Sequence, residues 1–419
     1  MIKELVEFQS IFRNKFRSHD EMISLQNRKL RSVIRHAYEN VPYYTSLFDK
    51  ESIKPGDVRT VEDLQLIPTS TKEDFIAAGC ERTVTKDTYL PTCTTRKTSG
   101  SSGKPFTIYL SKGDSIRRRL ILFRSLRHIG FRVRDRLAVL GGRQPEPIRF
   151  HQRLGFFRSL ILPPTLPVDK QREQLERFNP TVLWAYPTAL RKLLHSINFR
   201  LGDIIQPRIL ITAGEVFDEV LRKSFLENLD IEVFNLYGAQ EFGLTAFECM
   251  NHSGLHVLSD HVIQECCTDE IDSSPHPPGV AIITTLNAYV MPFIRYRVGD
   301  VFHYTNKKCT CAMTSPLICA PSGREKDRII LPSGKVLYPG DFKVLSEFPS
   351  IDQFRLIQQS SAKFLLQLVT DIKPDDETIS KIRSRVSKFL EDPVELDIRF
   401  VNFIIDEDLK FKIFVPNIL

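Results

Sequence analysis

Residues 98–105 read Thr98-Ser99-Gly100-Ser101-Ser102-Gly103-Lys104-Pro105, a run that combines two glycines, four hydroxyl side chains and one lysine. Glycines let backbone N–H groups turn toward an anion, hydroxyls donate further hydrogen bonds, and a lysine supplies a positive charge. The run therefore predicts a loop that holds a polyphosphate, as in ATP chemistry. It is not a Walker loop, because proline follows the lysine where that loop needs serine or threonine. The alternative interpretation is a flexible Ser/Gly linker.

Three further motifs follow this run in order along the chain. They are Asn235-Leu236-Tyr237-Gly238-Ala239-Gln240-Glu241-Phe242-Gly243, Tyr296-Arg297-Val298-Gly299-Asp300 and Gly323-Arg324-Glu325-Lys326-Asp327. Shorter segments accompany them, namely Val41-Pro42-Tyr43-Tyr44, Trp184-Ala185-Tyr186-Pro187, Ala213-Gly214-Glu215, Glu248-Cys249 and Tyr338-Pro339. One short motif arises easily by chance, but an ordered set is much more specific.

The ordered set resembles the core motifs of the adenylate-forming superfamily of acyl-CoA ligases and adenylation domains. It is most similar to the phenylacetate-CoA ligase-like branch, which includes relatives found with polysaccharide biosynthesis genes. The resemblance covers almost the whole chain. It implies a large N-terminal AMP-binding domain, residues 1–324, and a small mobile C-terminal domain, residues 325–419, with a hinge at Lys326 or Asp327.

Length and composition set limits that agree with at least two domains. The chain has 419 residues, of which 42% are hydrophobic, and this length exceeds what one hydrophobic core usually serves. The net charge of +7 is modest, and arginines are concentrated in one region. They are Arg117, Arg118, Arg119, Arg124, Arg127, Arg132, Arg134, Arg136, Arg143, Arg149, Arg153 and Arg158. This region is either a solvated surface or a rim that attracts anions such as ATP, coenzyme A or an acidic acceptor. No helix-turn-helix, zinc-finger or stacking-aromatic module accompanies the charge, so we expect no nucleic-acid partner.

Hydropathy and cysteine usage predict a cytoplasmic protein. No stretch approaches the roughly 18 apolar residues of a membrane span. The N-terminus carries charges where a secretory signal needs an apolar core. Eight cysteines in a chain of this length do not suggest a disulfide framework. The sequence leaves the oligomeric state open, a homodimer included.

Hydrophobic periodicity predicts an α/β fold in which β-sheets are flanked by helices. Residues 20–48 and 114–129 have helical spacing, and Val41-Pro42 ends the first helix. Short apolar strands are expected at 137–140, 182–185, 208–212 and 232–235, alternating with helices at 170–178, 187–199 and 216–228. Such alternation is typical of a buried, largely parallel sheet whose ligands bind at the carboxyl ends of the strands. From Lys326 onward a hairpin, four strands near 354–358, 364–370, 395–403 and 410–415, and a helix at 375–391 indicate a small α+β unit.

The resemblance assigns roles to individual residues. Thr98, Ser99, Gly100, Ser101, Ser102, Gly103 and Lys104 would form the loop over the β- and γ-phosphates of ATP. Tyr237 would pack on adenine, Gly238 beside it belongs to the same nucleotide-binding motif, and Gly214 and Glu215 would lie along the same ring. Glu241 would hold Mg²⁺, Asp300 would bind the ribose hydroxyls, and Arg324 would assist. Taken alone, Glu241 is equally suited to capping a helix and Asp300 to a turn after Gly299.

The superfamily's catalytic lysine lies near the C-terminus, usually after a glycine, and bridges the carboxylate and the phosphate. The matching place reads Asp408-Leu409-Lys410-Phe411-Lys412, which makes Lys410 the candidate and Lys412 the alternative. Leu409 stands where the family pattern has glycine. Both lysines are also explained as edge-strand residues that discourage aggregation.

Cysteine and histidine spacing forms a separate signal. Cys249-x6-His256 and Cys309-x-Cys311 offer three thiolates and one imidazole, which suit tetrahedral Zn²⁺. Some phenylacetate-CoA ligase-like relatives carry a similar pattern. His252 is an alternative ligand, and four incidental buried side chains are the other interpretation.

The sequence leaves the substrate and the acceptor open. Trp184, Tyr186 and Pro187 follow a strand and would wall a pocket for an aromatic or other small carboxylic acid, although Trp184 is more readily explained as a core residue. We expect the acyl group to pass to a thiol, with coenzyme A first among the candidates. An amine acceptor, giving an amide, and a nucleotide-binding regulator without turnover are the alternatives.

Overall fold

The computed structural model describes the chain except for residues 1–9, 15–16, 99–105, 142–149, 164, 198–199, 218–221, 223–230, 269–277, 349, 371, 403, 405–411 and 417–419. Contacts between Cα atoms divide the chain into two units. Unit 1 contains residues 1–130 and 236–319, and unit 2 contains residues 131–235 and 320–419. The boundary at residues 324 and 325 expected from the sequence stays a prediction. None of the described helices is both long and apolar enough to cross a bilayer.

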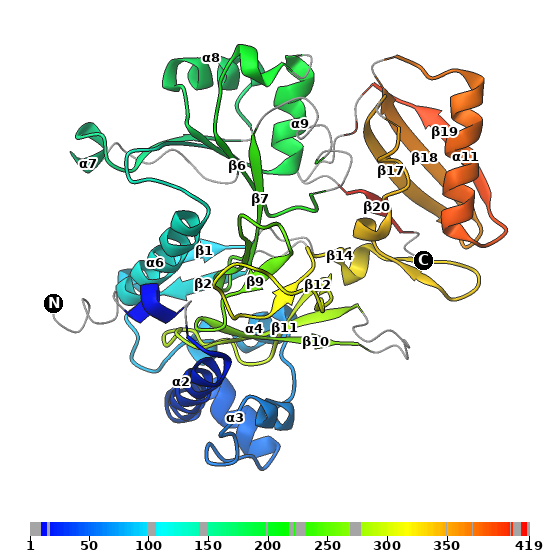
Figure 1. Cartoon of the computed structure of the whole chain (residues 1–419). Helices are drawn as coiled ribbons and strands as arrows, with labels where there is room; N and C mark the ends of the chain where they lie inside the picture. The colour runs from blue at the N-terminus through cyan, green and yellow to red at the C-terminus, as the bar shows by residue number, and fades with distance from the viewer. Residues whose placement is uncertain are drawn as a thin grey trace. The chain divides into compact units, whose positions relative to one another are not determined.

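Unit 1 begins with helices whose ends follow from local chemistry. Helix α2 starts in a capping box made by Ser18 and Glu21, and it ends at Asn40, where Val41 is extended and Pro42 opens α3. The predicted helix at 20–48 is therefore two consecutive helices (Figure 1). The helical elements of unit 1 are α2 (His19–Asn40), α3 (Pro42–Lys50), η1 (Glu62–Leu66), α4 (Lys72–Ala78), α5 (Cys80–Thr83), η2 (Leu90–Thr92) and α6 (Lys112–His128).

The strands of unit 1 are antiparallel. They are β1 (Thr94–Lys97), β2 (Thr107–Leu110), the second half of β7 (Glu232–Ala239), β8 (Gly243–Glu248), β9 (Leu255–Val257), β10 (Val262–Cys267), β11 (Gly279–Thr285), β12 (Tyr296–Phe302) and β13 (Leu317–Ile318). Strands β1 and β2 form a hairpin, β7 to β9 and β13 follow one another in one ladder, and β10 to β12 form another. The core between them is rich in rings: Phe75 stacks on Phe293 with centroids 5.2 Å apart.

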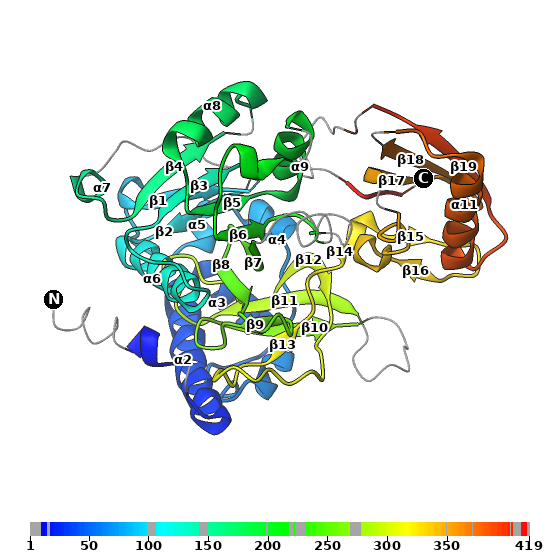
Figure 2. The same cartoon turned by 45° about the horizontal axis from the view of Figure 1, so that its top comes forward.

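The first part of unit 2 is the parallel sheet that the βα rhythm predicts. Its strands are β3 (Arg136–Leu140), β4 (Arg158–Leu162), β5 (Val182–Ala185), β6 (Ile209–Ala213) and the first half of β7. The order is β7-β6-β5-β3-β4, and β4, β3, β5 and β6 are parallel. The helical elements are α7 (Phe150–Arg153), α8 (Val168–Phe178), α9 (Pro187–Ser196) and η3 (Leu201–Asp203). Leucines of α8 and α9 share one hydrophobic core with residues of the sheet, and Figure 2 shows both helices beside its strands. Most of the predicted helix at 216–228 lies outside the described residues.

The C-terminal part of unit 2 is the α+β arrangement expected from the sequence. It consists of β14 (Gly323–Arg324), η4 (Glu325–Asp327), β15 (Ile329–Ile330), β16 (Val336–Leu337), η5 (Pro339–Asp341), β17 (Ile351–Ser360), β18 (Lys363–Thr370), α11 (Asp376–Leu390), β19 (Glu395–Phe400) and β20 (Phe414–Val415). The strand order is β19-β18-β17-β20, with only β17 and β18 antiparallel. Helix α11 is the crossover between the parallel strands β18 and β19, and its Ile382, Val386 and Leu390 are buried in the core of this sheet.

Candidate active site

A tight hairpin between β7 and β8 presents the Tyr-Gly motif and Glu241. Ala239 pairs with Gly243, and the N–H of Phe242 donates to the carbonyl of Ala239 over 3.2 Å, so the chain reverses within three residues. A Cβ atom on Gly238 would lie 2.2 Å from the carbonyl oxygen of Gly243. Only glycine fits at position 238, because that oxygen belongs to the paired strand itself.

Tyr237 and Asp300 come together from two motifs that are far apart in the sequence. The Tyr237 hydroxyl donates to the Oδ2 atom of Asp300 over 3.0 Å. Tyr237 is 8% exposed and belongs to the core of unit 1, whereas Asp300 lies on β12 directly after Gly299, which has a φ of +82°. The hydrogen bond fixes the carboxylate of Asp300 beside the aromatic ring that the sequence assigns to adenine.

Glu241 lies at the turn of the same hairpin and is nearly buried. Its carboxylate accepts a long hydrogen bond of 3.5 Å from the Tyr296 hydroxyl, and its side chain is 8% exposed. Burial raises the pKa of Tyr296, so its hydroxyl stays protonated and able to donate. A buried carboxylate of this kind fits Mg²⁺, because hard dications take oxygen ligands and bound phosphates complete their coordination.

Thr98 closes the base of the predicted phosphate loop. Its N–H donates to the carbonyl of Phe106 over 3.0 Å, and its Oγ1 atom accepts from the N–H of Phe106 over 3.3 Å. The pairing of Lys97 with Thr107 continues this register into β1 and β2. Ser99, Gly100, Ser101, Ser102, Gly103 and Lys104, which the sequence assigns to the phosphates, lie outside the described residues.

In unit 2, the ring of Tyr186 lies between two glycines at strand ends. A Cβ atom on Gly141 would lie 2.7 Å from Cδ2 of Tyr186, and one on Gly214 would lie 3.1 Å from Cε1. Both glycines have positive φ values, +128° and +83°. Gly141, Tyr186 and Gly214 directly follow β3, β5 and β6, so the ring sits at the carboxyl edge of the parallel sheet, where such sheets bind ligands.

Glu215 is tied to the start of α9. Its Oε2 atom accepts from the N–H of Thr188 over 2.8 Å and from the Thr188 hydroxyl over 2.7 Å. A carboxylate at a helix N-terminus satisfies a backbone donor and interacts favourably with the helix dipole. Pro187 is the first residue of α9 and is buried, and Trp184 is half-buried on β5. Trp184 and Pro187 at the end of β5, and Gly214 and Glu215 at the end of β6, therefore lie at the same sheet edge as Tyr186.

The remaining predicted residues lie in the second part of unit 2. Arg324 ends β14 after Gly323, whose φ is +134° and whose missing Cβ leaves room for Pro339 at 2.7 Å. The carbonyl of Lys412 accepts from Nε of Arg355 over 3.0 Å. Lys410, the candidate catalytic lysine, lies outside the described residues.

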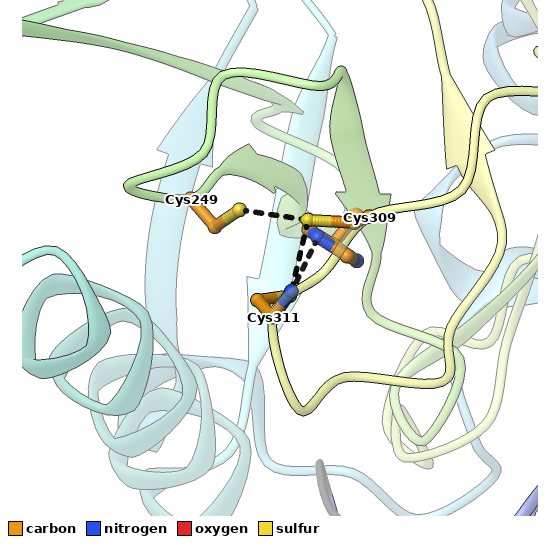
Figure 3. A group of neighbouring side chains, drawn as sticks. Cys249, Cys309 and Cys311 are labelled. Carbon is orange, nitrogen blue, oxygen red and sulfur yellow. Dashed lines mark hydrogen bonds between the residues drawn. The ribbon is translucent and has the colours of Figure 1, made fainter.

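Cys249, His256, Cys309 and Cys311 form one cluster in unit 1, as the spacing predicts. Their candidate ligand atoms all lie within 4.8 Å of one another. The Sγ atoms of Cys249 and Cys309 are 3.4 Å apart, and Sγ of Cys311 is 3.3 Å from Nε2 of His256. Figure 3 shows the three cysteines turned toward one another. Separations of this order are those of ligands around one tetrahedral Zn²⁺ with metal–sulfur bonds of about 2.3 Å.

Neighbouring groups suit this cluster to a metal ion. Nδ1 of His256 is 3.3 Å from the Ser315 hydroxyl, an outer contact that orients Nε2 toward the cysteines. Burial lowers the pKa of His256 to about 4, which keeps the imidazole neutral as a ligand must be. Burial also raises the pKa of Cys249 to about 12, so its thiolate needs a nearby cation. The alternative ligand His252 instead pairs with Glu248, Nδ1 to Oε1 over 3.2 Å.

The sequence did not indicate the roles of two residues at this site. Tyr296 belongs to a recognised motif, but its contact with Glu241 depends on a pairing of distant strands. Arg118 was one arginine among many, yet it binds the turn that carries Glu241. The region rich in arginine is not uniformly solvated: Arg124 is buried and forms a two-pronged ion pair with Asp260 at 2.7 and 2.9 Å.

Comparison with known proteins agrees with this geometry. No family model matches the chain. The phenylacetate-coenzyme A ligase of Thermus thermophilus is 25% identical, with 91% of this chain and 92% of that protein covered. The enzyme of the same name from Escherichia coli is 28% identical over 75% of this chain and 74% of its own. A solved 2-hydroxyisobutyryl-CoA ligase with 2-HIB-AMP bound has a TM-score of 0.82 at 17% identity, covering 97% of this chain and 91% of that chain.

The fold is thus that of the adenylate-forming ligases, with mixed sheets flanked by helices. At the level of sequence the chain is similar to phenylacetate-coenzyme A ligases, which supports the phenylacetate-CoA ligase-like branch of that superfamily.

Proposed function

We propose that this protein is an ATP-dependent, AMP-forming acid–CoA ligase. It activates a small carboxylic acid to an acyl-adenylate, releases pyrophosphate, and transfers the acyl group to the thiol of coenzyme A. The observation that carries the proposal is the assembly of Tyr237, Glu241 and Asp300 within unit 1, because the adenine and magnesium roles come from one motif and the ribose role comes from another, distant motif. The relatives named as phenylacetate-coenzyme A ligases support the reaction class. The 2-hydroxyisobutyryl-CoA ligase was also solved with 2-HIB-AMP and CoA together.

Both partners of the first step are anions, so the protein has to position them and neutralise charge. A carboxylate oxygen of the acid attacks the α-phosphorus of ATP, and the bond to pyrophosphate breaks. Glu241 would hold Mg²⁺, which offsets phosphate charge when bound. Tyr237 packs against the base, and Asp300 accepts hydrogen bonds from the ribose hydroxyls. Thr98 and the loop through Lys104 would hold the β- and γ-phosphates, and Arg324 would assist.

Lys410 is proposed to bridge the acid and the α-phosphate during adenylation. Its replacement by alanine is expected to abolish adenylation and leave ATP binding nearly intact. Lys412 is the internal comparison, because its backbone is held by Arg355 on β17. If Lys410→Ala retains adenylation and Lys412→Ala loses it, the role belongs to Lys412.

Tyr186 is proposed to set the size of the acyl pocket, with Trp184 and Pro187 beside it. Its ring fills the space between Gly141 and Gly214, so its size would limit the acid that binds at the strand ends. Gly214 and Glu215 would lie along the adenine. Contacts from Glu215 to Thr188 would keep this edge rigid.

The four-residue cluster is proposed to bind a structural Zn²⁺. Three cysteines and one histidine would occupy all four coordination positions of a tetrahedral Zn²⁺ and leave no position for a substrate. The ion would fasten the segment after β8 to the Cys309–Cys311 segment.

A division at residues 324 and 325, with the C-terminal part as a mobile domain, is likewise proposed. So is a cytoplasmic location, which agrees with the absence of disulfides among the eight cysteines, all of which are described.

The test is acid-dependent exchange of labelled pyrophosphate into ATP with Mg²⁺, over aromatic, aliphatic, hydroxy and amino acids. Exchange with one class of acid establishes adenylation and identifies the substrate. Addition of coenzyme A should then give an acyl-CoA and AMP in equal amounts. A product formed only with an amine would favour an amide ligase. ATP binding without exchange for any acid would contradict the proposed function and favour a regulator.

A further inference from the structure

Arg118 lies on α6, the helix that begins directly after the β1–β2 hairpin. The helix starts in a capping box made by Ser111 and Asp114, so Arg118 occupies its second turn. The guanidinium reaches the turn between β7 and β8, more than a hundred residues away in the sequence. The contact is therefore a tertiary one within unit 1.

The guanidinium binds two consecutive peptide carbonyls. One terminal nitrogen donates to the carbonyl of Gln240 over 2.8 Å, and the other donates to the carbonyl of Glu241. The aliphatic part of the same side chain packs on Gly243, where a Cβ atom would lie 3.4 Å from Cδ of Arg118. The side chain of Arg118 thus contacts the turn at both ends, from Gln240 and Glu241 to Gly243.

The opposite side of the turn is held by rings. Phe242 is fully buried and meets Phe293 edge-on, with centroids 5.5 Å apart. Tyr296 contacts both the Phe242 ring, at 5.8 Å, and the carboxylate of Glu241, at 3.5 Å. The side chain of Glu241 is oriented by Tyr296, and its backbone is oriented by Arg118.

We propose that Arg118 is a positioning residue that fixes the backbone of the Gln240–Glu241 turn so that the Glu241 carboxylate is held ready for the nucleotide-bound divalent cation. This inference rests on the proposed function. A guanidinium is suited to the task because its planar donors can satisfy two adjacent acceptors at once, whereas an ammonium group is a single point charge. Burial lowers the pKa of Arg118 to about 10, so the group remains protonated at neutral pH. Arg118 donates to the backbone carbonyls of the turn, so the Glu241 carboxylate is oriented by Tyr296 instead.

The first experiment measures the turn directly, without activity. Hydrogen exchange of the ligand-free protein is followed by mass spectrometry in a peptide that contains residues 240–243. Arg118→Met retains most of the aliphatic stem and removes both donors, so exchange in this peptide should become about tenfold faster or more. Arg119→Met is the matched control, since Arg119 is the next residue of α6 and is exposed. Unchanged exchange in Arg118→Met would overturn the inference.

The second experiment measures the cation. Binding of Mn²⁺ with ATP is followed by electron paramagnetic resonance, and pyrophosphate exchange is measured as a function of Mg²⁺. Arg118→Met should weaken Mn²⁺ binding and raise the KM for Mg²⁺ by about tenfold, with a smaller effect on the KM for the acid. Arg118→Lys should fall between the wild type and Arg118→Met. Millimolar guanidinium should restore part of the cation affinity in a less bulky Arg118→Ala variant.

These outcomes separate the two proposals. A wild-type protein without acid-dependent exchange contradicts the proposed function, whereas the hydrogen exchange of the turn still tests the contact made by Arg118. A wild-type protein with exchange whose Arg118→Met and Arg118→Lys variants keep the wild-type KM for Mg²⁺ contradicts the positioning role alone.

Discussion

The Tyr237 hydroxyl and the Asp300 carboxylate are joined by a hydrogen bond of 3.0 Å across 63 residues of sequence. Asp300→Asn should reduce the preference for ATP over 2′-deoxyATP, because an amide is a weaker acceptor for ribose hydroxyls. Tyr237→Phe should raise the KM for ATP roughly tenfold through loss of a hydrogen bond to a charged group. Pyrophosphate exchange with both nucleotides measures these effects. Asp20→Asn, an exposed change on α2, is the control. Equal discrimination in wild type and Asp300→Asn would exclude ribose recognition by this residue.

Gly238 should tolerate no side chain. Because a Cβ atom would lie 2.2 Å from a backbone oxygen, Gly238→Ala must separate β7 from β8 and should lower the free energy of unfolding by about 3 kcal/mol. Denaturation in urea measures the change. Gly56→Ala, at a position with no atom within 4 Å of the added methyl group, should leave stability nearly unchanged. A Gly238→Ala protein as stable as Gly56→Ala would show that the turn adopts another conformation.

The cysteine cluster predicts about one zinc ion for each chain purified from zinc-containing medium. Cys311→Ser should lose most of the metal and lower the thermal midpoint, because closed zinc sites contribute directly to folding. Elemental analysis and thermal unfolding with and without a chelator measure both effects. Cys93→Ser removes a thiol outside the cluster and should change neither. Wild-type protein that contains no zinc and does not respond to chelator would contradict a structural zinc site.

His261 predicts a loss of stability in mild acid. The ring is buried, with Nε2 bonded to the carbonyl of Phe242 at 2.9 Å and Nδ1 close to Asn287 at 3.4 Å. Burial lowers its pKa to about 4. Between pH 6.5 and 4 the unfolded chain binds a proton that the folded chain does not, so stability falls as the pH falls through this window. The contribution of this residue is about 2 kcal/mol between pH 7.5 and 5.

Substitution isolates that contribution. His261→Gln keeps a donor for Phe242 but does not titrate, so its unfolding free energy should vary less between pH 7.5 and 5 than that of the wild type. Urea denaturation at the two pH values gives the difference. Identical pH dependence in both proteins would mean that folding does not lower the pKa of this histidine.

Local patterns account for the elements predicted from the sequence. The helical period at 114–129 corresponds to α6, which starts in the capping box of Ser111 and Asp114, and the run at 170–178 corresponds to α8, whose Leu175 is buried. The apolar runs at 137–140 and 182–185 are β3 and β5, as expected for strands of a parallel sheet that is largely buried. Pro42 marks a break between helices for a purely local reason, since it lacks the N–H that a continuing helix needs.

The candidate site was predicted only where residue type and spacing carry chemistry. Cysteines and a histidine at ligand spacing can be recognised in the sequence as a candidate metal site. A glycine-rich run and a Tyr-Gly pair can be recognised as candidate nucleotide-binding motifs. Arg118 gives no such signal, because its role depends on two carbonyl oxygens whose position is unrelated to the local sequence of α6. The ring of Tyr186 likewise lies between Gly141 and Gly214 only because parallel strands end at the same edge.

By itself, the sequence determined the α/β class, the order of the motifs, the elements with strong periodicity, and the residue types that a nucleotide and a metal ion require. These features are local, since periodicity, caps and ligand chemistry act over a few residues. Only the tertiary structure decided that Tyr237 bonds Asp300, that Glu241 is held between Tyr296 and Arg118, and that His256 rather than His252 joins the cysteines. Such contacts depend on the register and twist of strands that pair across long distances in the chain, and no local pattern specifies them.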